Sequence, residues 1–150
     1  MIVDIATLTG AATLGLGRRH AVLYTPSDPL AAALTAAGEA AGERLWRMPL
    51  VDDYRESLES AVADVAHVKT REMGGGSITA ALFLQRFAGD LPWAHLDIAG
   101  PGRAEADEHE VVKGGTAFGT RALLYWLESA QPADLATPEV SRAAGASRRR

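Results

Sequence analysis

The sequence predicts an α/β fold built on a mainly parallel sheet. Residues 2–6 and 93–98 are short, largely apolar runs that end in turn-forming residues, as buried parallel strands do. Between them, apolar residues lie almost all round the segment 77–88, which is typical of a helix buried in a domain. Strands and helices that follow one another in this way indicate a sheet covered by helices.

The loop after the first strand is a predicted ligand-binding position. Residues 2–6 run into Thr-Leu-Thr-Gly at 7–10. In open α/β sheets, ligands bind in the loops at the carboxyl ends of the strands. The small apolar residues 10–16 then predict a short helix that ends at Gly17.

A second strand and a capped helix are predicted next. Residues 20–24 form the candidate strand. Ser27 is a favourable N-cap residue and Pro29 suits the first turn of a helix, so the alanine-rich run that follows is predicted as helical to about Gly42.

The middle of the chain, residues 46–76, is less regular. Pro49 interrupts it, residues 52–58 are predicted as a short helix, and the glycine-rich run 71–76 is predicted as a loop. The helix at 77–88 follows directly.

The last third contains one strand and one helix. The strand at 93–98 is followed by a Gly-Pro-Gly turn at 100–102 and a polar loop at 103–110. Residues 119–128 are predicted as the closing helix, with one apolar stripe formed by Leu123, Leu124 and Leu127. Residues 131–150 are rich in Ala, Pro, Ser and Thr and end in three arginines, which predicts a disordered tail.

Composition excludes several classes of protein. The 150 residues carry a formal net charge of −4 and no basic cluster before the extreme C-terminus, so we expect no nucleic-acid partner. Because the chain has no cysteine, it has no disulfide scaffold and no thiolate nucleophile. No apolar stretch is long enough to span a membrane and no signal peptide is visible, so we expect a cytoplasmic protein without a membrane partner.

Six segments of the chain together resemble one known family. They are Asp4 to Ala11, Trp46 to Leu50, Ser60 with Ala63 and Asp64, Gly75 to Leu84, Trp93 to Gly100, and Gly114 to Gly119. In this order, over residues 2–128, the chain resembles the second half of the catalytic domain of the cytosol (leucyl) aminopeptidases, family M17. The resemblance implies part of a three-layer α/β/α sandwich of the zinc-exopeptidase type, incomplete at the N-terminus, with residues 1–130 as its C-terminal portion.

The same resemblance implies an activity: removal of N-terminal amino acids from a peptide substrate. Two divalent metal ions, zinc or manganese, would activate a bridging water and polarise the scissile carbonyl, and family members assemble as hexamers. In that family the metal ligands and catalytic residues come from a Lys, several Asp and an Asn-Thr-Asp-Ala-Glu-Gly-Arg motif that precedes the first strand. This sequence has no such motif, so we assign no catalytic residue and expect no metal bound by this chain alone.

What the resemblance does assign is part of a substrate pocket. Thr7, Leu8 and Gly10 match the family's substrate-contacting loop, in which backbone groups of Leu8 and Gly10 hold the peptide. Ala99 matches a residue that lines the pocket for the N-terminal side chain. The alternative interpretation is a non-catalytic fragment that binds its own kind or another partner, and strands without upstream neighbours would make the isolated chain associate or become partly molten.

Two carboxylates lie inside predicted strands, where an unpaired charge is costly. Asp4 and Asp97 could be metal ligands, or structural groups bonded to the backbone or to a basic partner. Because the resemblance places the metal ligands elsewhere, we favour the structural interpretation. His95 shares a strand face with Asp97 and could form a catalytic pair with it, but a histidine in a buried strand is more often a hydrogen-bonded core residue.

Three further sequence patterns are interpreted as structural features and not as binding sites. The acidic run 105–110 lacks the spacing of a calcium loop and is predicted to be solvated surface. The glycines at 74–76 could form an anion-binding nest, but tight packing between loop and helix is the favoured reason for them. If Ala117 requires a positive φ, its side chain costs about 1 kcal/mol or more.

Overall fold

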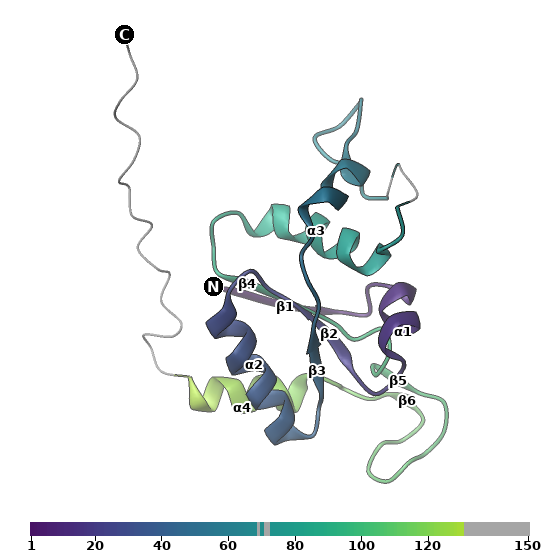
Figure 1. The fold of residues 1–150 in the computed structure, drawn as a ribbon. Coiled ribbons are helices and arrows are strands. Elements are labelled where there is room, and N and C mark those ends of the chain that lie inside the picture. Colours follow the sequence, from purple (N-terminus) through teal and green to yellow (C-terminus); the bar gives the residue numbers. More distant parts are fainter. Residues whose placement is uncertain (69, 71–72, 131–150) are drawn as a thin grey trace.

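A computed structural model describes residues 1–68, 70 and 73–130 of the chain (Figure 1). The elements, in order, are β1 (Ile2–Ala6), α1 (Gly10–Leu16), β2 (Ala21–Tyr24), α2 (Asp28–Ala41), β3 (Leu45–Arg47), the 3₁₀ helix η1 (Asp52–Leu58), α3 (Gly76–Ala88), β4 (Trp93–Asp97), β5 (Arg103–Ala104), β6 (Gly114–Gly115) and α4 (Thr120–Ser129). The predicted tail, 131–150, and part of the predicted loop 71–76 lie outside the described residues.

The sheet confirms the predicted α/β class and is mostly parallel. Its four strands lie in the order β1, β4, β2, β3, with β1 parallel to β4 and β2 parallel to β3. The two pairs meet in one antiparallel contact between β2 and β4, which the sequence pattern did not predict. Figure 1 shows α3 on one side of this sheet and α2 with α4 on the other, which makes three layers.

Each face of the sheet buries its own apolar cluster. Leu23 and Leu96 point toward α2 and α4, where they meet Leu34 and Trp126. Tyr24 and Trp93 point to the other side and join residues of α1 and α3. Since successive side chains of a strand alternate between faces, each buried strand supplies both clusters, and this explains why β2 and β4 are buried at every position.

The predicted helix ends at Gly17, Ser27 and Gly42 are confirmed. Thr9 is the N-cap of α1, where its hydroxyl accepts the N–H of Ala12, and Gly17 follows the last helical residue. Ser27 caps α2 in the same way, and Gly42 ends that helix in the left-handed conformation. Side-chain oxygens at these positions satisfy N–H groups that have no partner within the helix.

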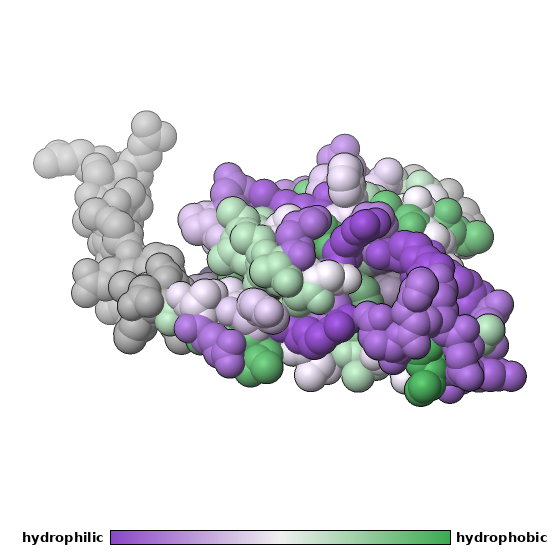
Figure 2. Space-filling view, turned by 90° about the horizontal axis from the view of Figure 1, so that it is seen from below, coloured by the Kyte–Doolittle hydropathy of each residue, from purple (hydrophilic) through white to green (hydrophobic). Residues whose placement is uncertain are grey.

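The predicted apolar stripe of α4 is wrong in part. Leu124 and Leu127 are 53% and 56% exposed, whereas Ala122 and Trp126 are the buried residues of the helix. Trp126 packs into the apolar cluster between α2 and the sheet, and the buried carboxylate of Glu43 accepts the N–H of Ala122 in the first turn of α4 at 2.8 Å. Figure 2, which views the side of α2 and α4, shows hydrophobic surface only as separate patches among hydrophilic residues.

Three short strands were not predicted. In β3 only Leu45 is buried, so the run gives no alternating pattern. The strands β5 and β6 have two residues each and form an antiparallel pair, with β5 at the start of the predicted loop 103–110 and β6 just after that loop. Nearby, Ala117 has a φ of 54°. At this positive φ its side chain costs about 1 kcal/mol or more. None of the helices in the described part of the chain is both long and apolar enough to cross a membrane.

The free edge of β1 should make the isolated chain associate. In the described residues β1 pairs only with β4, and Ile5 on this strand is 40% exposed. Because an unpaired strand edge with apolar side chains recruits other strands, we expect the isolated chain to sediment as dimers or larger species at micromolar concentration. Placing a charge on the edge with Ile5→Lys should shift the distribution toward monomer. A monomeric parent chain that melts cooperatively would contradict this expectation.

Candidate functional site

The predicted pocket residues gather where β1 and β4 end. Thr7, Leu8 and Gly10 follow β1, and Ala99 follows β4. The two strands are parallel and in register from Ile2 with Trp93 to Ala6 with Asp97, so both chains leave the sheet at the same edge. This edge is the usual ligand-binding position of a parallel sheet.

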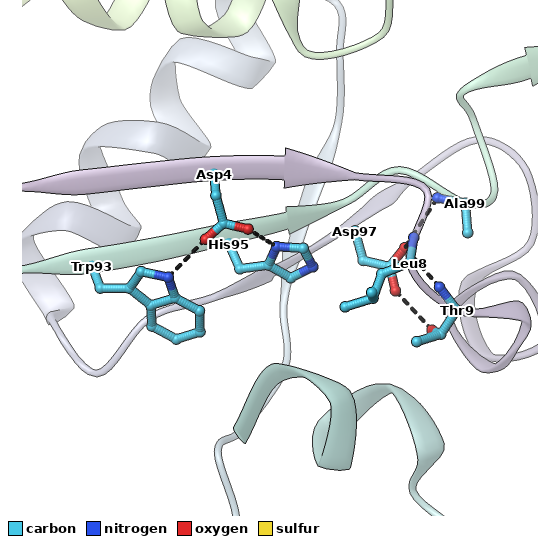
Figure 3. Close-up of polar contacts among 7 residues, drawn as sticks. All are labelled: Asp4, Leu8, Thr9, Trp93, His95, Asp97 and Ala99. Atoms are coloured by element: carbon cyan, nitrogen blue, oxygen red, sulfur yellow. Dashed lines mark hydrogen bonds and ion pairs between the residues drawn. The ribbon is translucent and has the colours of Figure 1, made fainter. Parts of the chain in front are cut away.

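Asp97 is the side chain that connects the two segments (Figure 3). Its Oδ1 accepts the N–H of Leu8 at 3.0 Å, of Thr9 at 3.4 Å and of Ala99 at 3.1 Å, and its Oδ2 accepts the Thr9 hydroxyl at 2.7 Å. The carboxylate is almost fully buried. The predicted structural role, with bonds to backbone groups, is confirmed for Asp97.

The four predicted pocket residues differ in exposure. Thr7, Leu8 and Gly10 are exposed, and Ala99 is half-buried. A Cβ at Gly10 would have no neighbour within 4 Å, so open space lies beside the first residue of α1. The N–H groups of Leu8 and Ala99 are already donated to Asp97, and a peptide at this edge would therefore meet other atoms of these residues.

The second strand carboxylate, Asp4, belongs to a separate group. Its Oδ2 accepts the indole N–H of Trp93 at 2.7 Å, and its Oδ1 lies 2.5 Å from Nδ1 of His95. A proton on Nδ1 lets the imidazole donate to Asp4. His95 therefore pairs with Asp4 and not with Asp97. Figure 3 shows that this group lies along the strands, away from the loop ends.

His95 is a core residue, as the favoured interpretation held. It is fully buried between the rings of Tyr24 and Trp93, whose centroids both lie 6.4 Å from the imidazole. The Nε2 atom has no hydrogen-bond partner among the described residues. Burial raises the pKa of the neighbouring Tyr24 hydroxyl, although its hydrogen bond to Ser77 opposes the shift. This hydroxyl stays protonated and donates to Ser77.

Two further patterns have structural explanations. The acidic run 105–110 is exposed, as predicted, and Glu108 pairs with Arg19 at 2.7 Å, which lowers the pKa of that carboxyl group. Of the two glycines before α3, Gly75 packs closely, because a Cβ on it would lie 3.0 Å from the ring of Tyr54, whereas a Cβ on Gly74 would meet nothing within 4 Å. Gly75 also has a φ of 55°, which favours glycine.

Among the described residues, the side chains at the carboxyl ends of β1 and β4 do not form a metal centre by themselves. Across the part of the chain that the structure describes, no three His, Asp or Glu side chains lie close enough together to hold a metal ion. The oxygens of Asp97 already accept N–H and hydroxyl groups, and those of Asp4 face Trp93 and His95.

Comparison with known proteins settles the family. Residues 1–124 match the catalytic domain of the cytosol aminopeptidase family, M17. The chain belongs to this family. The match begins at the first residue and ends within α4, so it includes both strands and both loops of the candidate site.

Relatives and solved structures agree with this assignment. The chain is 52% identical over 128 residues to a probable cytosol aminopeptidase of a Picosynechococcus species, covering 85% of this chain and 26% of that protein. A probable cytosol aminopeptidase of Prochlorococcus marinus is 53% identical over 127 residues, 84% of this chain and 26% of that protein. The chain thus spans about a quarter of the length of these curated relatives.

Two solved structures have the same fold over this region. The bottromycin maturation enzyme BotP in complex with manganese is 48% identical, with a TM-score of 0.79, and is matched over 85% of this chain and 28% of that one. A tomato leucine aminopeptidase variant is 44% identical, with a TM-score of 0.74, over 83% of this chain and 24% of that one. This M17 chain therefore corresponds to about a quarter of each solved chain.

The sequence did not indicate how Asp97 and Thr9 act in the site. A threonine directly before a predicted helix is a signal for an N-cap, and it could have identified Thr9. A buried aspartate at the last position of a strand points to donors in the adjoining loops. Which loops supply them depends on the pairing of β1 with β4, which brings Leu8 close to Asp97, 89 positions later in the chain.

Proposed function

We propose that this chain is the substrate-binding part of a metal-dependent aminopeptidase that removes N-terminal amino acids from peptides. The observation that carries the proposal lies at the carboxyl ends of β1 and β4, where Asp97 accepts the N–H groups of both Leu8 and Ala99. In the proposal, Thr7, Leu8 and Gly10 contact the peptide, and Ala99 lines the pocket for its first side chain. Membership of the cytosol aminopeptidase family supports these roles.

In the proposed enzyme, the metal ions are held by residues outside this chain. Asp4 and Asp97 do not fit as metal ligands, because their oxygens are already engaged by protein donors. Two divalent ions, zinc or manganese, would supply an activated water and polarise the carbonyl of the scissile bond. The residues of this chain bind and orient the peptide. The manganese complex of BotP supports the choice of metal.

A chimera tests the activity directly. Residues 1–124 of this chain would replace the matching segment of the tomato leucine aminopeptidase, a 44% identical relative. We expect the purified, manganese-loaded chimera to hydrolyse leucine amide, and the isolated 150-residue chain to match the buffer blank. A chimera with a scrambled segment is the control.

Metal binding gives an independent test of the same proposal. Titration calorimetry of the isolated chain with zinc or manganese should show no stoichiometric site. A tight one-to-one or two-to-one site, together with peptide cleavage by the isolated chain, would overturn the assignment of the metal ligands to residues elsewhere.

A second candidate is a non-catalytic fragment that associates with its own kind, and the free edge of β1 favours it. A folded but inactive chimera would support this candidate. For the enzyme, we further propose a cytoplasmic location, in keeping with relatives named cytosol aminopeptidase, and a homohexameric assembly once the rest of the catalytic domain is present.

A further inference from the structure

A single buried carboxylate holds both segments of the proposed pocket wall. Asp97 is 1% exposed, and its four hydrogen bonds all go to residues of the two loops, namely Leu8, Thr9 and Ala99. These donors are N–H and hydroxyl groups, not charged side chains. Hydrogen bonds to a carboxylate are about twice as strong as those between neutral groups, so these bonds fix the loop positions more firmly than neutral partners could.

The hydrogen bonds continue from Asp97 into α1. The Thr9 hydroxyl donates to Oδ2 of Asp97 at 2.7 Å and accepts the N–H of Ala12 at 3.1 Å. One hydroxyl thus connects the end of β4 to the first turn of the helix. Gly10, the third proposed peptide contact in this loop, is the first residue of that helix. A displacement of Asp97 would therefore shift the loop and the start of α1 together.

We propose that Asp97 is a positioning residue, which sets the distance between the peptide-holding loop at 7–10 and the pocket residue Ala99. The inference rests on the proposed function, because it assigns a substrate role to these segments. In this role Asp97 touches no substrate, but it positions both the loop at 7–10 and Ala99. Binding sites require such support, since a displacement of about 1 Å can cost about a hundredfold in rate.

The test uses Asp97→Asn in the manganese-loaded chimera. The amide keeps the size of the side chain and one oxygen acceptor, but it places an NH₂ group where Oδ2 accepts the Thr9 hydroxyl. We expect kcat/KM for leucine amide to fall about tenfold, mainly through KM, because the loss affects binding of the substrate and of the transition state alike. The manganese content should stay unchanged.

Asp4→Asn is the matched control. It removes the charge of the other strand carboxylate, whose partners are Trp93 and His95 and not the pocket loops. We expect KM to remain within about twofold of the parent, whatever happens to the melting temperature. An equal rise in KM in both variants would overturn the proposal, because it would indicate a general effect of strand carboxylates. Loss of manganese in Asp97→Asn would also overturn it, since Asp97 would then be a metal ligand.

Hydrogen exchange provides a measurement that does not depend on activity. In Asp97→Asn we expect faster amide exchange in both segments, 7–10 and 99–100, because each loses anchoring to the same carboxylate. Thr9→Val keeps Asp97 but removes the hydroxyl, and it should speed exchange at Ala99 as well, although Thr9 reaches Ala99 only through Asp97. If Asp97→Asn does not fold, Thr9→Val decides the question alone.

The two proposals fail in different ways. An inactive parent chimera would overturn the proposed function, while the exchange data would still decide whether Asp97 holds the two segments as one unit. An active parent with unchanged KM and unchanged exchange in Asp97→Asn and Thr9→Val would overturn the role of Asp97 and leave the proposed function intact.

Discussion

Gly100→Ala should destabilise the protein more than any other single-methyl substitution considered for this chain. A Cβ at Gly100 would lie 2.2 Å from the carbonyl oxygen of Gly17 and 3.5 Å from Cα of Arg18. Both neighbours are backbone atoms, so no change of rotamer can relieve the clash. The connection from α1 to β2 would have to move away from the end of β4. Overpacking typically costs about 1–3 kcal/mol, and we expect about 3 kcal/mol here because the obstacle is rigid.

Thermal unfolding of the chimera measures this effect. Gly115→Ala is the matched control, because a Cβ at Gly115 meets nothing within 4 Å and the residue does not have a positive φ. We expect a clear fall in melting temperature for Gly100→Ala and almost none for Gly115→Ala. Equal melting temperatures would mean that the close approach of Gly17 to Gly100 does not persist in solution.

Ala99→Leu should change substrate preference. Ala99 is half-buried at the end of β4, and its N–H is fixed to Asp97 at 3.1 Å. A leucine side chain would fill the space proposed for the first side chain of the substrate. In the chimera we expect hydrolysis of Leu and Met N-termini to drop about tenfold or more, and hydrolysis of Ala and Gly N-termini to drop less, since pocket filling discriminates by size.

Gly10→Ala gives the contrasting control. The structure leaves open space around a Cβ at Gly10, so the fold should tolerate the substitution. If the backbone of Gly10 approaches the peptide, the added methyl group should impair all substrates alike, because it stands between the backbone and the peptide. The measurement is kcat/KM over a series of amino-acid amides. A uniform loss in Ala99→Leu with unchanged melting temperature would contradict the pocket assignment of Ala99.

Local sequence signals predicted most of the helices and the two main strands. Apolar runs gave β1 and β4, and Thr9, Ser27 and the glycines after α1 and α2 lie where helix ends require them. These features depend on residues within a few positions of one another, so the chain carries them locally. The short strand β3 could not be predicted, since two of its three residues are exposed.

The outcome for α4 shows the limit of such signals. The sequence contains a genuine stripe at Leu123, Leu124 and Leu127, yet the helix turns Ala122 and Trp126 inward. The partners of this face are distant in sequence: Trp126 packs into the cluster of α2 and the sheet, and Glu43, 79 positions earlier than Ala122, accepts the Ala122 N–H. Leucines at the surface are common and cost little, whereas a buried carboxylate without a donor would be costly.

For the candidate site, the sequence by itself determined which residues are present and that a strand carboxylate needs a partner. It identified the family, and the resemblance predicted Thr7, Leu8, Gly10 and Ala99 as substrate contacts. Only the tertiary structure decided that Asp4 pairs with His95 and Trp93, while Asp97 binds both loops. The physical reason is that partners of a buried charge are chosen by distance in space, and here the register of β1 against β4 brings together residues 89 positions apart.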